Sequence, residues 1–334
     1  MRPLRIIIFG YGTMGRLSAR YAHEKGAEIV AVYMRSTAGK DLSAPEINGA
    51  EICTPEVPFE KHEADLVLVT HATSIEALNE PARMAAEAGL DVLTIAEDAF
   101  EPFYRDGEIG RCRELDALFR MHGKTMVSVG VQDSFWYAQP MAFLSSAQKI
   151  ERLRGRNTCD LSLFGTAGAH SHGLGLTPEE FIAGGHDKVQ KGRGVFEVAL
   201  RPLARGLGRR IVDSKVENLP VLAEDDLNLP HVGVSIRKGR TRGHAEKVTF
   251  TLDNGTILEG EFHMCYMPEG ETPYNEWVIE GVPSMNMRSD NFRGDIITCA
   301  ALVNRIPDVF AAEPGFLSVD QLPAARFYDA FVRN

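Results

Sequence analysis

Cysteine is scarce in this chain, with five cysteines among 334 residues. No two of them form a C-x-x-C arrangement, and their odd, scattered distribution predicts neither a disulfide framework nor a zinc site. We therefore expect a cytoplasmic protein whose thiols stay reduced. The first apolar run ends at Gly10, far too early to span a bilayer, so no targeting segment is expected.

Positive charge is also in deficit, because 36 lysines and arginines face 46 aspartates and glutamates and leave a net charge of −10. A negative protein repels phosphate backbones and anionic lipids, which argues against nucleic acid and membrane partners. Hydrophobic residues (44%) and charged residues (25%) occur in ordinary globular proportions, so nothing suggests a disordered or fibrous chain. The length allows two domains.

Apolar runs and helical stripes alternate in the first part of the chain. Runs rich in β-branched residues occupy residues 6–9, 29–33, 66–70, 92–95 and 125–129. Helical patterns separate them, among which residues 75–88 and 110–121 each end near a glycine. This alternation predicts the α/β class, with a Rossmann doubly wound parallel sheet.

The pattern changes from about residue 135, where aromatic residues, glycines and longer strand-like segments begin. Asn254-Gly255 between two alternating runs predicts a hairpin and hence antiparallel pairing. A second α+β domain with a mixed or antiparallel sheet is therefore expected. Residues 202–208 and 237–243 are rich in glycine and arginine, and we expect exposed connections there.

A glycine-rich turn joins the first expected strand to the first expected helix. It has the pattern G-x-G-x-x-G and consists of Gly10, Tyr11, Gly12, Thr13, Met14 and Gly15. The three glycines allow a tight turn, a close approach of the main chain to a pyrophosphate, and close packing of helix on strand. A purely structural turn is the alternative, but the strand–turn–helix context favours a dinucleotide site whose phosphates meet the helix N-terminus.

The residues after the second strand bear on the choice between NAD and NADP. An NAD site usually ends this strand with an acid that binds the ribose hydroxyls, whereas this chain has Arg35, Ser36 and Thr37. A guanidinium and two hydroxyls suit a 2′-phosphate. The sequence therefore predicts NADP(H) as the preferred cofactor and NAD(H) as a second one, with a solvated loop arginine as the alternative interpretation.

Small and polar residues follow the strand at residues 66–70. His71, Ala72 and Thr73 come at its carboxyl end, where ligands bind in open α/β sheets, so we expect them at the cofactor. Thr73 or Ser74 could also cap the next helix, and the two interpretations are compatible.

Two adjacent carboxylates, Glu97 and Asp98, follow the strand at residues 92–95. Carboxylates in such a place are costly to desolvate unless they have a partner or a function. Asp98 is suited to cap a helix, so we favour Glu97 as the catalytic residue and keep Asp98 as the alternative. This hypothesis requires the Glu97 side chain to project into a cleft, within reach of the carbon that exchanges hydride with the dinucleotide.

Amide and aromatic side chains gather at the expected domain junction and suit a small-substrate pocket. The candidates there are Gln132, Phe135, Trp136 and Tyr137. Core packing is the alternative for the aromatic residues. Asn157 and His172 are further candidates in the second domain. His170 and His172 could pair on a metal but lack a third ligand nearby, so no metal is predicted.

Longer motifs in the chain resemble those of the 2,4-diaminopentanoate dehydrogenases and of the native amine dehydrogenases related to them. The motifs are residues 10–14, 97–100, 132–136, 173–181, 303–309 and 312–316. The resemblance implies reversible oxidation of a small amine to a ketone and ammonia with NAD(P). It also implies a homodimer whose carboxyl-terminal segment returns to the Rossmann domain.

The resemblance implies domains and residue roles as well. Residues 1–135 with 295–334 form the NAD(P)-binding domain, and residues 136–294 form the substrate-binding and dimerisation domain. The catalytic glutamate of the family matches Glu97, its pocket aromatics match Phe135 and Trp136, and its histidine matches His172. Asp98 stands where relatives often have a second glutamate, which is a departure from the family pattern.

Rival families fit less well. Sugar dehydrogenases of similar plan place Glu-Lys-Pro where this chain has Glu97-Asp98-Ala99, and the lysine is absent here. Dihydrodipicolinate reductases carry His-His with a nearby lysine, which residues 169–173 do not reproduce. A 2,4-diaminopentanoate dehydrogenase proper and a non-catalytic NADP-responsive binding protein stay open as alternatives, although a sensor would not need the carboxylate and the aromatic pocket.

Overall fold

The computed structural model describes residues 2–164, 172–189, 192, 194–230 and 233–331. The chain divides into two compact units, Met1–Ala138 with Asp295–Asn334, and Gln139–Gly294. We call them the first unit and the second unit. The expected domains, 1–135 with 295–334 and 136–294, have boundaries near these, and their independence as domains stays a prediction.

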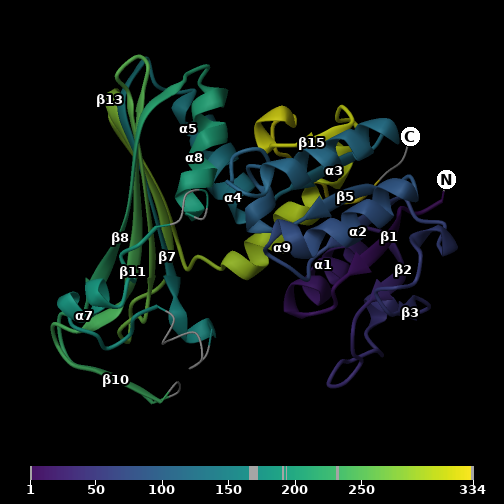
Figure 1. The fold of residues 1–334 in the computed structure, drawn as a ribbon, viewed down its shortest axis with the longest axis horizontal. Coiled ribbons are helices and arrows are strands. Elements are labelled where there is room, and N and C mark those ends of the chain that lie inside the picture. The colour runs from purple at the N-terminus through teal and green to yellow at the C-terminus, as the bar shows by residue number, and fades with distance from the viewer. Residues whose placement is uncertain (1, 165–171, 190–191, 193, 231–232, 332–334) are drawn as a thin grey trace. The chain divides into compact units, whose positions relative to one another are not determined.

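The first unit is built on a seven-stranded parallel sheet with the strand order β15-β6-β5-β4-β1-β2-β3 (Figure 1). Its strands are β1 (Arg5–Phe9), β2 (Glu28–Tyr33), β3 (Glu51–Cys53), β4 (Leu66–Val69), β5 (Asp91–Thr94), β6 (Thr125–Ser128) and β15 (Gly315–Leu317). The strands β4, β5 and β6 are buried throughout, because apolar residues cover both of their faces. The predicted Rossmann sheet is confirmed.

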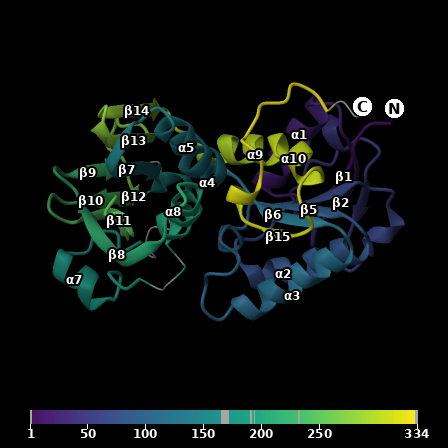
Figure 2. The same cartoon turned by 90° about the horizontal axis from the view of Figure 1, so that it is seen from above.

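Helices cover both faces of this sheet. They are α1 (Thr13–Glu24), α2 (Ile75–Glu87), α3 (Ile109–Met121), α9 (Gly294–Asn304) and α10 (Ile306–Phe310). Figure 2 shows α2 and α3 on one face, and α1, α9 and α10 on the other. Leu78 of α2 and Leu115 of α3 are fully buried in one core with Val67 and Val92 of the sheet, so the hydrophobic effect holds these layers together.

The second unit contains a six-stranded sheet with the strand order β14-β13-β7-β12-β11-β8. Its strands are β7 (Lys149–Asp160), β8 (Ile211–Leu222), β11 (Thr241–Leu252), β12 (Ile257–Cys265), β13 (Tyr274–Val282) and β14 (Met285–Asp290). β7 and β12 run parallel and the other neighbours antiparallel, so the predicted mixed sheet is confirmed. The predicted hairpin at Asn254-Gly255 joins β11 to β12, with Gly255 at a φ of +84°.

Helix α8 (Val195–Gly206) packs on one face of the second sheet. Because Gly260 of β12 has no side chain, the ring of Phe196 lies directly against the strand, where a Cβ at position 260 would come within 2.5 Å of it. In the same way, Trp277 of β13 lies across Gly155 of β7. The two glycines let large aromatic rings fill this core.

The expectation of exposed connections at residues 202–208 and 237–243 was wrong in part. Pro202 lies buried inside α8, and Thr241 is a fully buried residue at the start of β11. The apolar stripe of α8, with Phe196, Leu200 and Leu203 buried, stabilises a helix that tolerates a proline in its interior.

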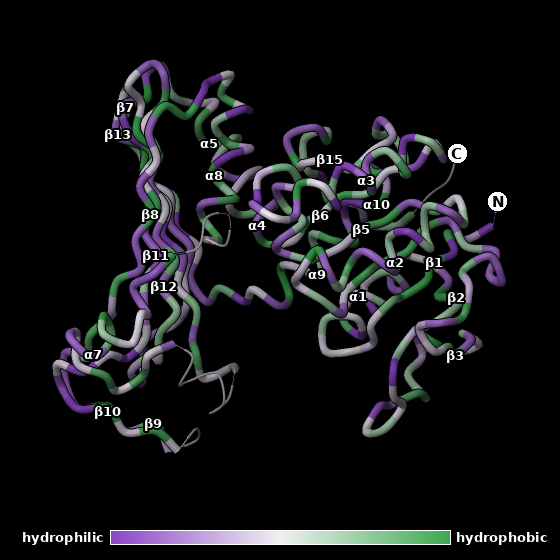
Figure 3. Tube along the Cα trace, viewed as in Figure 1, coloured by the Kyte–Doolittle hydropathy of each residue, from purple (hydrophilic) through white to green (hydrophobic). Residues whose placement is uncertain are grey.

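Short elements complete the chain. They are η1 (Pro45–Ile47), η2 (Phe59–Lys61), η3 (Glu97–Ala99), α4 (Val131–Asp133), the π-helix η4 (Ser134–Ala138), α5 (Gln139–Leu144), η5 (Leu161–Phe164), α7 (Pro178–Ala183), β9 (Leu227–Leu229), β10 (Val234–Ile236) and η6 (Val319–Gln321). Figure 3 shows hydrophilic stretches along β8, β11 and β12 of the second unit. Within the described residues, the helices are too short or too polar to cross a bilayer.

Candidate functional site

A cavity of about 730 Å³ in the first unit surrounds the glycine-rich turn. Its lining includes nine of the predicted cofactor residues, which are Gly10, Tyr11, Gly12, Thr13, Met14, Arg35, Ser36, His71 and Ala72. The lining does not include Gly15, Thr37 or Thr73. The turn, the loop after β2 and the loop after β4 therefore share one cavity, as the carboxyl ends of neighbouring parallel strands should.

The three glycines of the turn have different surroundings. Gly10 has a φ of +102°, and a Cβ there would lie 2.4 Å from the Cβ of His71. A Cβ on Gly15 would lie 1.9 Å from the carbonyl oxygen of Gly10, so α1 packs directly against the turn. A Cβ on Gly12 would meet no atom within 4 Å. The space at Gly12 is thus open to an approaching ligand.

The start of α1 suits a pyrophosphate. Its N-cap residue is Gly12, and no side chain caps the helix there. The first N–H groups of a helix lack partners within the helix and carry a partial positive charge. An anion at this helix end would satisfy them, which is the arrangement that dinucleotide sites use.

Two cations line the cavity beyond β2. Arg35 was predicted from the sequence, whereas Lys40 was missed and also lines the cavity, together with Ser36. The Ser36 Oγ accepts a hydrogen bond from the Ala38 backbone N–H at 3.2 Å, which shapes this loop. Two cationic side chains and a hydroxyl suit a phosphate group. A second basic residue in the same loop was the sequence signal for Lys40.

A polar cluster supports the wall of this cavity behind Tyr33. The Tyr33 hydroxyl lies 2.9 Å from His62 Nε2, and the Cys53 Sγ lies 3.7 Å from the same nitrogen. Glu51, Cys53 and His62 offer metal-ligand atoms within 4.8 Å of one another. Burial raises the pKa of the Cys53 thiol and lowers the pKa of His62, so both are neutral partners in a hydrogen-bonded cluster that joins β2 and β3.

Glu97 begins the 3₁₀ turn η3 directly after β5. The backbone N–H of Asp98 donates to the carbonyl oxygen of Thr73 at 3.0 Å, which places this turn beside the loop of His71 and Ala72. The Glu97 side chain is exposed to solvent, yet protein surrounds its carboxyl group closely enough that desolvation raises its pKa. Within the described chain, the Glu97 side chain has no hydrogen-bond or ion-pair partner; its backbone carbonyl accepts the N–H of Phe100.

Asp98 has a different environment. Its carboxylate forms an ion pair with Arg105, and their side chains are 20% and 9% exposed. The helix that Asp98 was suited to cap is absent from this stretch, since α3 begins only at Ile109. The Asp98 carboxylate therefore has a structural role in its ion pair with Arg105. The Glu97 carboxylate is not paired with another side chain of the described chain.

The predicted substrate segment forms an irregular helical stretch after β6. Gly130, at a φ of +140°, leads into α4 and then into the π-helix η4. Gln132 and Trp136 are 5% and 2% exposed, whereas Phe135 and Tyr137 are partly exposed. Of these three aromatic residues, Trp136 is the one whose side chain is buried in the core. π-Helical turns occur frequently at functional sites.

Arg305 anchors this segment from the distant carboxyl-terminal part of the chain. Its guanidinium donates to both carboxylate oxygens of Asp133, at 2.6 and 2.8 Å, and to Asp308 at 2.8 Å. The three side chains are 1–4% exposed. A bidentate ion pair of this kind fixes the orientation of the guanidinium relative to the carboxylate. The sequence motif around residue 305 does not reveal the partner of Arg305, which lies 172 positions away.

Asn157 belongs to a row of residues that face one another across the second sheet. The row consists of Asn275, Asn157, Phe262, Glu246 and Asn218. Opposed residues in neighbouring strands share a face. Glu246 accepts the backbone N–H groups of Val195 and Phe196 at 2.8 Å each, so this is the face that α8 covers. Asn157 is 1% exposed.

His172 lies near the same face. Its Nδ1 lies 3.0 Å from Nε2 of His244 on β11, and Nδ1 of His244 lies 2.8 Å from Oδ1 of Asn218 on β8. The sequence did not predict His244 or Asn218. His170 lies outside the described residues. Asn157 and His172 belong to the second unit, whereas Glu97 and Gln132 belong to the first.

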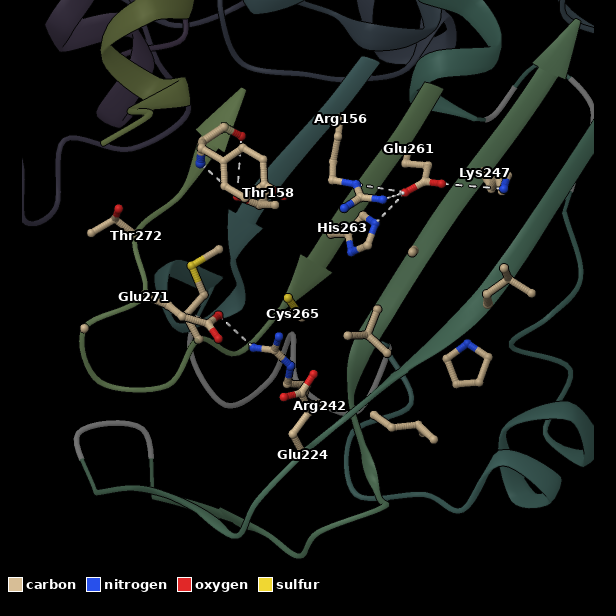
Figure 4. Close-up of a pocket in the computed structure, with 18 of the residues that line it drawn as sticks. Arg156, Thr158, Glu224, Arg242, Lys247, Glu261, His263, Cys265, Glu271 and Thr272 are labelled. Atoms are coloured by element: carbon tan, nitrogen blue, oxygen red, sulfur yellow. Dashed lines mark hydrogen bonds and ion pairs between the residues drawn. The ribbon is translucent and has the colours of Figure 1, made fainter. Parts of the chain in front are cut away.

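A second cavity, of about 780 Å³, lies on the opposite face of the six-stranded sheet (Figure 4). Glu261 lines this cavity, and its carboxylate pairs with Arg156 at 2.7 Å, His263 at 3.1 Å and Lys247 at 3.6 Å. The hydrogen bond from His263 lowers the pKa of Glu261 most, and Arg156 adds to it, so that the pKa is about 2 despite burial. The central charges of this face are thus paired within the chain.

Known proteins are similar in sequence to both units of the chain. Residues 141–334 match the family model of the 2,4-diaminopentanoate dehydrogenase C-terminal domain. The chain is 25% identical over 340 residues to a 2,4-diaminopentanoate dehydrogenase from Acetoanaerobium sticklandii, covering 98% of this chain and 95% of that protein.

Solved structures extend the likeness to the whole fold. An amine dehydrogenase from Mycobacterium smegmatis is 26% identical with a TM-score of 0.82, over 98% of both chains. A scyllo-inositol dehydrogenase from Lactobacillus casei, with bound NAD(H) and scyllo-inositol, is 16% identical with a TM-score of 0.53, over 86% of this chain and 76% of that one. The second likeness shows the fold alone. Because the family model covers more than half of its length, the chain belongs to the 2,4-diaminopentanoate dehydrogenase family.

Proposed function

We propose that the protein is an NAD(P)-dependent amine dehydrogenase, which converts a small amine reversibly to a ketone and ammonia. The observation that carries this proposal is the pair of carboxylates after β5. Asp98 is bound by Arg105. Glu97 lies beside the loop that lines the dinucleotide cavity and has a raised pKa, and its side chain has no hydrogen-bond or ion-pair partner in the described part of the chain. A carboxylate kept without a partner is a candidate general base.

The cofactor proposal rests on the cavity of the first unit. The turn of Gly10 to Gly15 and the start of α1 would hold the pyrophosphate, and Arg35, Ser36 and Lys40 would hold a 2′-phosphate. NADP(H) is therefore the preferred cofactor, and NAD(H) is the second one. When bound, the nicotinamide dinucleotide supplies the hydride acceptor for the amine carbon.

Glu97 performs the proton transfers in this proposal. Its carboxylate takes a proton from the substrate ammonium, which frees the nitrogen lone pair that stabilises the oxidised carbon. The same carboxylate then takes a proton from the water that attacks this carbon, and returns it to nitrogen as ammonia leaves. Because Glu97 is exposed, the net proton can pass to solvent between these steps.

Substrate-binding residues are proposed for each unit by itself. Phe135 and Tyr137 are the partly exposed aromatic residues of the π-helix, and Gln132 is the buried amide beside them. Trp136 supports them from the core. Asn157 and His172 are the substrate-binding residues that we propose for the second unit. An apolar pocket with a few polar groups orients a small amine for reaction.

The test is a panel of short-chain and cyclic ketones, each supplied with ammonium and NADPH, with the absorbance of the reduced cofactor followed over time. We expect consumption of NADPH that requires both the ketone and ammonium. Consumption without ammonium would indicate alcohol chemistry instead. NADPH binding without turnover on any ketone would favour a cofactor-responsive binding protein and overturn the proposal.

A narrower substrate is favoured by one comparison, since the curated relative that spans the chain is a 2,4-diaminopentanoate dehydrogenase. Under this alternative, 2,4-diaminopentanoate is the physiological amine. The oxidation assay with this diamine, run beside a monoamine of equal carbon number, distinguishes the two substrates by their kcat/KM values.

We further propose that the protein is a cytoplasmic homodimer. Its five cysteines are free thiols, which supports a reducing compartment. The face of the second sheet that carries Arg156 and Glu261 is the surface that we propose for the second copy. Sedimentation equilibrium should give twice the mass of one chain, and a single-chain mass at micromolar concentration would contradict the dimer.

A further inference from the structure

A chain of hydrogen bonds in the second unit ends on His172. It begins at the backbone carbonyl of His186, whose oxygen lies 2.6 Å from the Nδ2 of Asn218. It continues from Asn218 Oδ1 to His244 Nδ1 at 2.8 Å, and from His244 Nε2 to His172 Nδ1 at 3.0 Å. Once the donor and the acceptor of the first hydrogen bond are known, the donors and acceptors of the next two bonds follow.

The carbonyl of His186 fixes the direction, because a carbonyl oxygen can only accept. Asn218 must therefore present its NH2 group to this oxygen, which leaves its Oδ1 to accept from His244. The proton of a neutral His244 is then on Nδ1, and its Nε2 carries a lone pair. That lone pair accepts the Nδ1 proton of His172. The Nε2 of a neutral His172 therefore carries a lone pair and no proton, and we call it bare.

The surroundings keep both imidazoles neutral. Burial lowers the pKa of His244 to about 4, with His172 and His186 contributing to the shift. Burial, and then His186, lowers the pKa of His172 as well. Near neutral pH the hydrogen-bond chain therefore holds no extra proton, and its direction follows from the neutral forms.

The fold holds His172 at the end of this chain. A Cβ on the next residue, Gly173, would lie 2.8 Å from the ring of Phe181, so the backbone packs closely on that buried ring. Backbone hydrogen bonds then tie the segment to the start of β11, from Gly175 N–H to Thr241 and from Thr241 N–H to Leu176, each 2.8 Å long. These contacts hold the turn that carries His172 in place beside His244.

We propose that Asn218 and His244 are positioning residues that fix His172 as a hydrogen-bond acceptor, with its bare Nε2 directed to an N–H or O–H group of the substrate. The contact between His172 and the substrate rests on the proposed function, which assigns His172 to the substrate. The tautomer itself follows from the contacts of the second unit. An acceptor at this place favours amines that carry a further donor group, a second amine or a hydroxyl.

The first test reads the tautomers by NMR and does not depend on activity. The full-length protein is labelled with ¹⁵N-histidine, and long-range ¹H–¹⁵N correlation spectra are recorded at pH 8, with His172→Gln and His244→Gln variants for assignment. We expect His172 and His244 both to be protonated on Nδ1. Protonation of His172 on Nε2 would overturn the proposal.

The variant Asn218→Leu removes the acceptor that orders the chain. His244 can then donate from Nε2 to His172 Nδ1, which forces the proton of His172 onto Nε2, so we expect both imidazoles to change tautomer together. The matched control, Asn286→Leu, makes the same substitution at an exposed site on β14 of the same sheet and should leave both tautomers unchanged. Unchanged tautomers in Asn218→Leu would contradict the positioning role.

The second test uses turnover, with amines that carry or lack a second N–H or O–H donor. In Asn218→Leu we expect the KM of the donor-bearing amine to rise about tenfold, as loss of one hydrogen bond predicts. Its kcat, the KM of the amine without a donor and the Kd of NADPH should change less than twofold. Equal KM changes for both amines would overturn the substrate contact, even where the NMR result supports the tautomer.

Discussion

Arg305 and Asp133, which are 172 positions apart in the chain, form a bidentate ion pair with N–O distances of 2.6 and 2.8 Å. Asp133 follows Gln132 directly and precedes the π-helix that carries Phe135 and Tyr137. Arg305 therefore links the carboxyl-terminal part of the chain to the proposed substrate segment. A buried guanidinium between two carboxylates is stable only while all three groups are present.

Substitution of Arg305 should destabilise the first unit strongly. In Arg305→Met the carboxylates of Asp133 and Asp308 stay buried without a cation, which costs about 3–5 kcal/mol of unfolding free energy. Urea unfolding followed by circular dichroism measures it. Arg154→Met, which breaks an exposed pair with Glu280, is the matched control and should cost about 0–1 kcal/mol. A loss as small as the control's in Arg305→Met would contradict the anchoring role.

The glycine-rich turn allows a prediction that separates binding from folding. Gly12→Ala should fold normally, because its Cβ would meet no atom within 4 Å, but should weaken NADPH binding by about tenfold or more where the pyrophosphate approaches. Gly15→Ala should lower the melting temperature as well, since its Cβ would lie 1.9 Å from the Gly10 oxygen. Thermal unfolding and fluorescence titration with NADPH measure the two effects. Normal NADPH affinity in Gly12→Ala would place the pyrophosphate elsewhere.

Much of the first unit was predictable because its signals are local. Each long strand is an apolar run of consecutive residues, and the glycine-rich turn is six residues long. In the sheet of the first unit, the strands that the sequence did not predict are β3 and β15. They have three residues each and form the two edges of this sheet. β15 pairs with β6 from the far end of the chain, and no local pattern encodes that pairing.

The site was predictable only where a residue follows a strand. Arg35 and His71, which line the cavity, could be named because parallel strands end at the same edge of a sheet, whereas Glu97 was named on the same ground and stays a prediction. Lys40 was missed since it lies further along its loop, and His244 since it lies in the middle of a strand whose pairing places it beside His172. Pro202 misled the helix assignment because burial of α8 outweighs the cost of its proline.

Arg35 and Lys40 should determine the preference for NADP(H). Each charge-assisted contact with a 2′-phosphate is worth enough that Arg35→Ala and Lys40→Ala should each raise the Kd of NADPH about tenfold. The Kd of NADH, which lacks this phosphate, should change less than twofold. Arg20→Ala, an exposed cation on α1, is the control. Equal losses for both cofactors would refute the assignment of the 2′-phosphate site.

Glu97 and Asp98 should respond in opposite ways to loss of charge. Glu97→Gln should lower kcat by about 10²–10⁴, the range of general base catalysis, and leave the Kd of NADPH and the melting temperature unchanged. Asp98→Asn should lower the melting temperature, because its ion pair with Arg105 is lost, while kcat falls less. Near-normal turnover in Glu97→Gln would remove Glu97 from the reaction.

The pH dependence of amine oxidation should report the raised pKa of Glu97. Below this pKa the carboxyl group is protonated and cannot accept the proton of the substrate, so kcat/KM should fall about tenfold for each further pH unit. Because desolvation raises the pKa above the usual 4.5, the acid limb should lie above that value. Added salt should not move the limb, since salt screens charges and not desolvation. An acid limb that shifts with ionic strength, or that persists in Glu97→Gln, would assign it to another group.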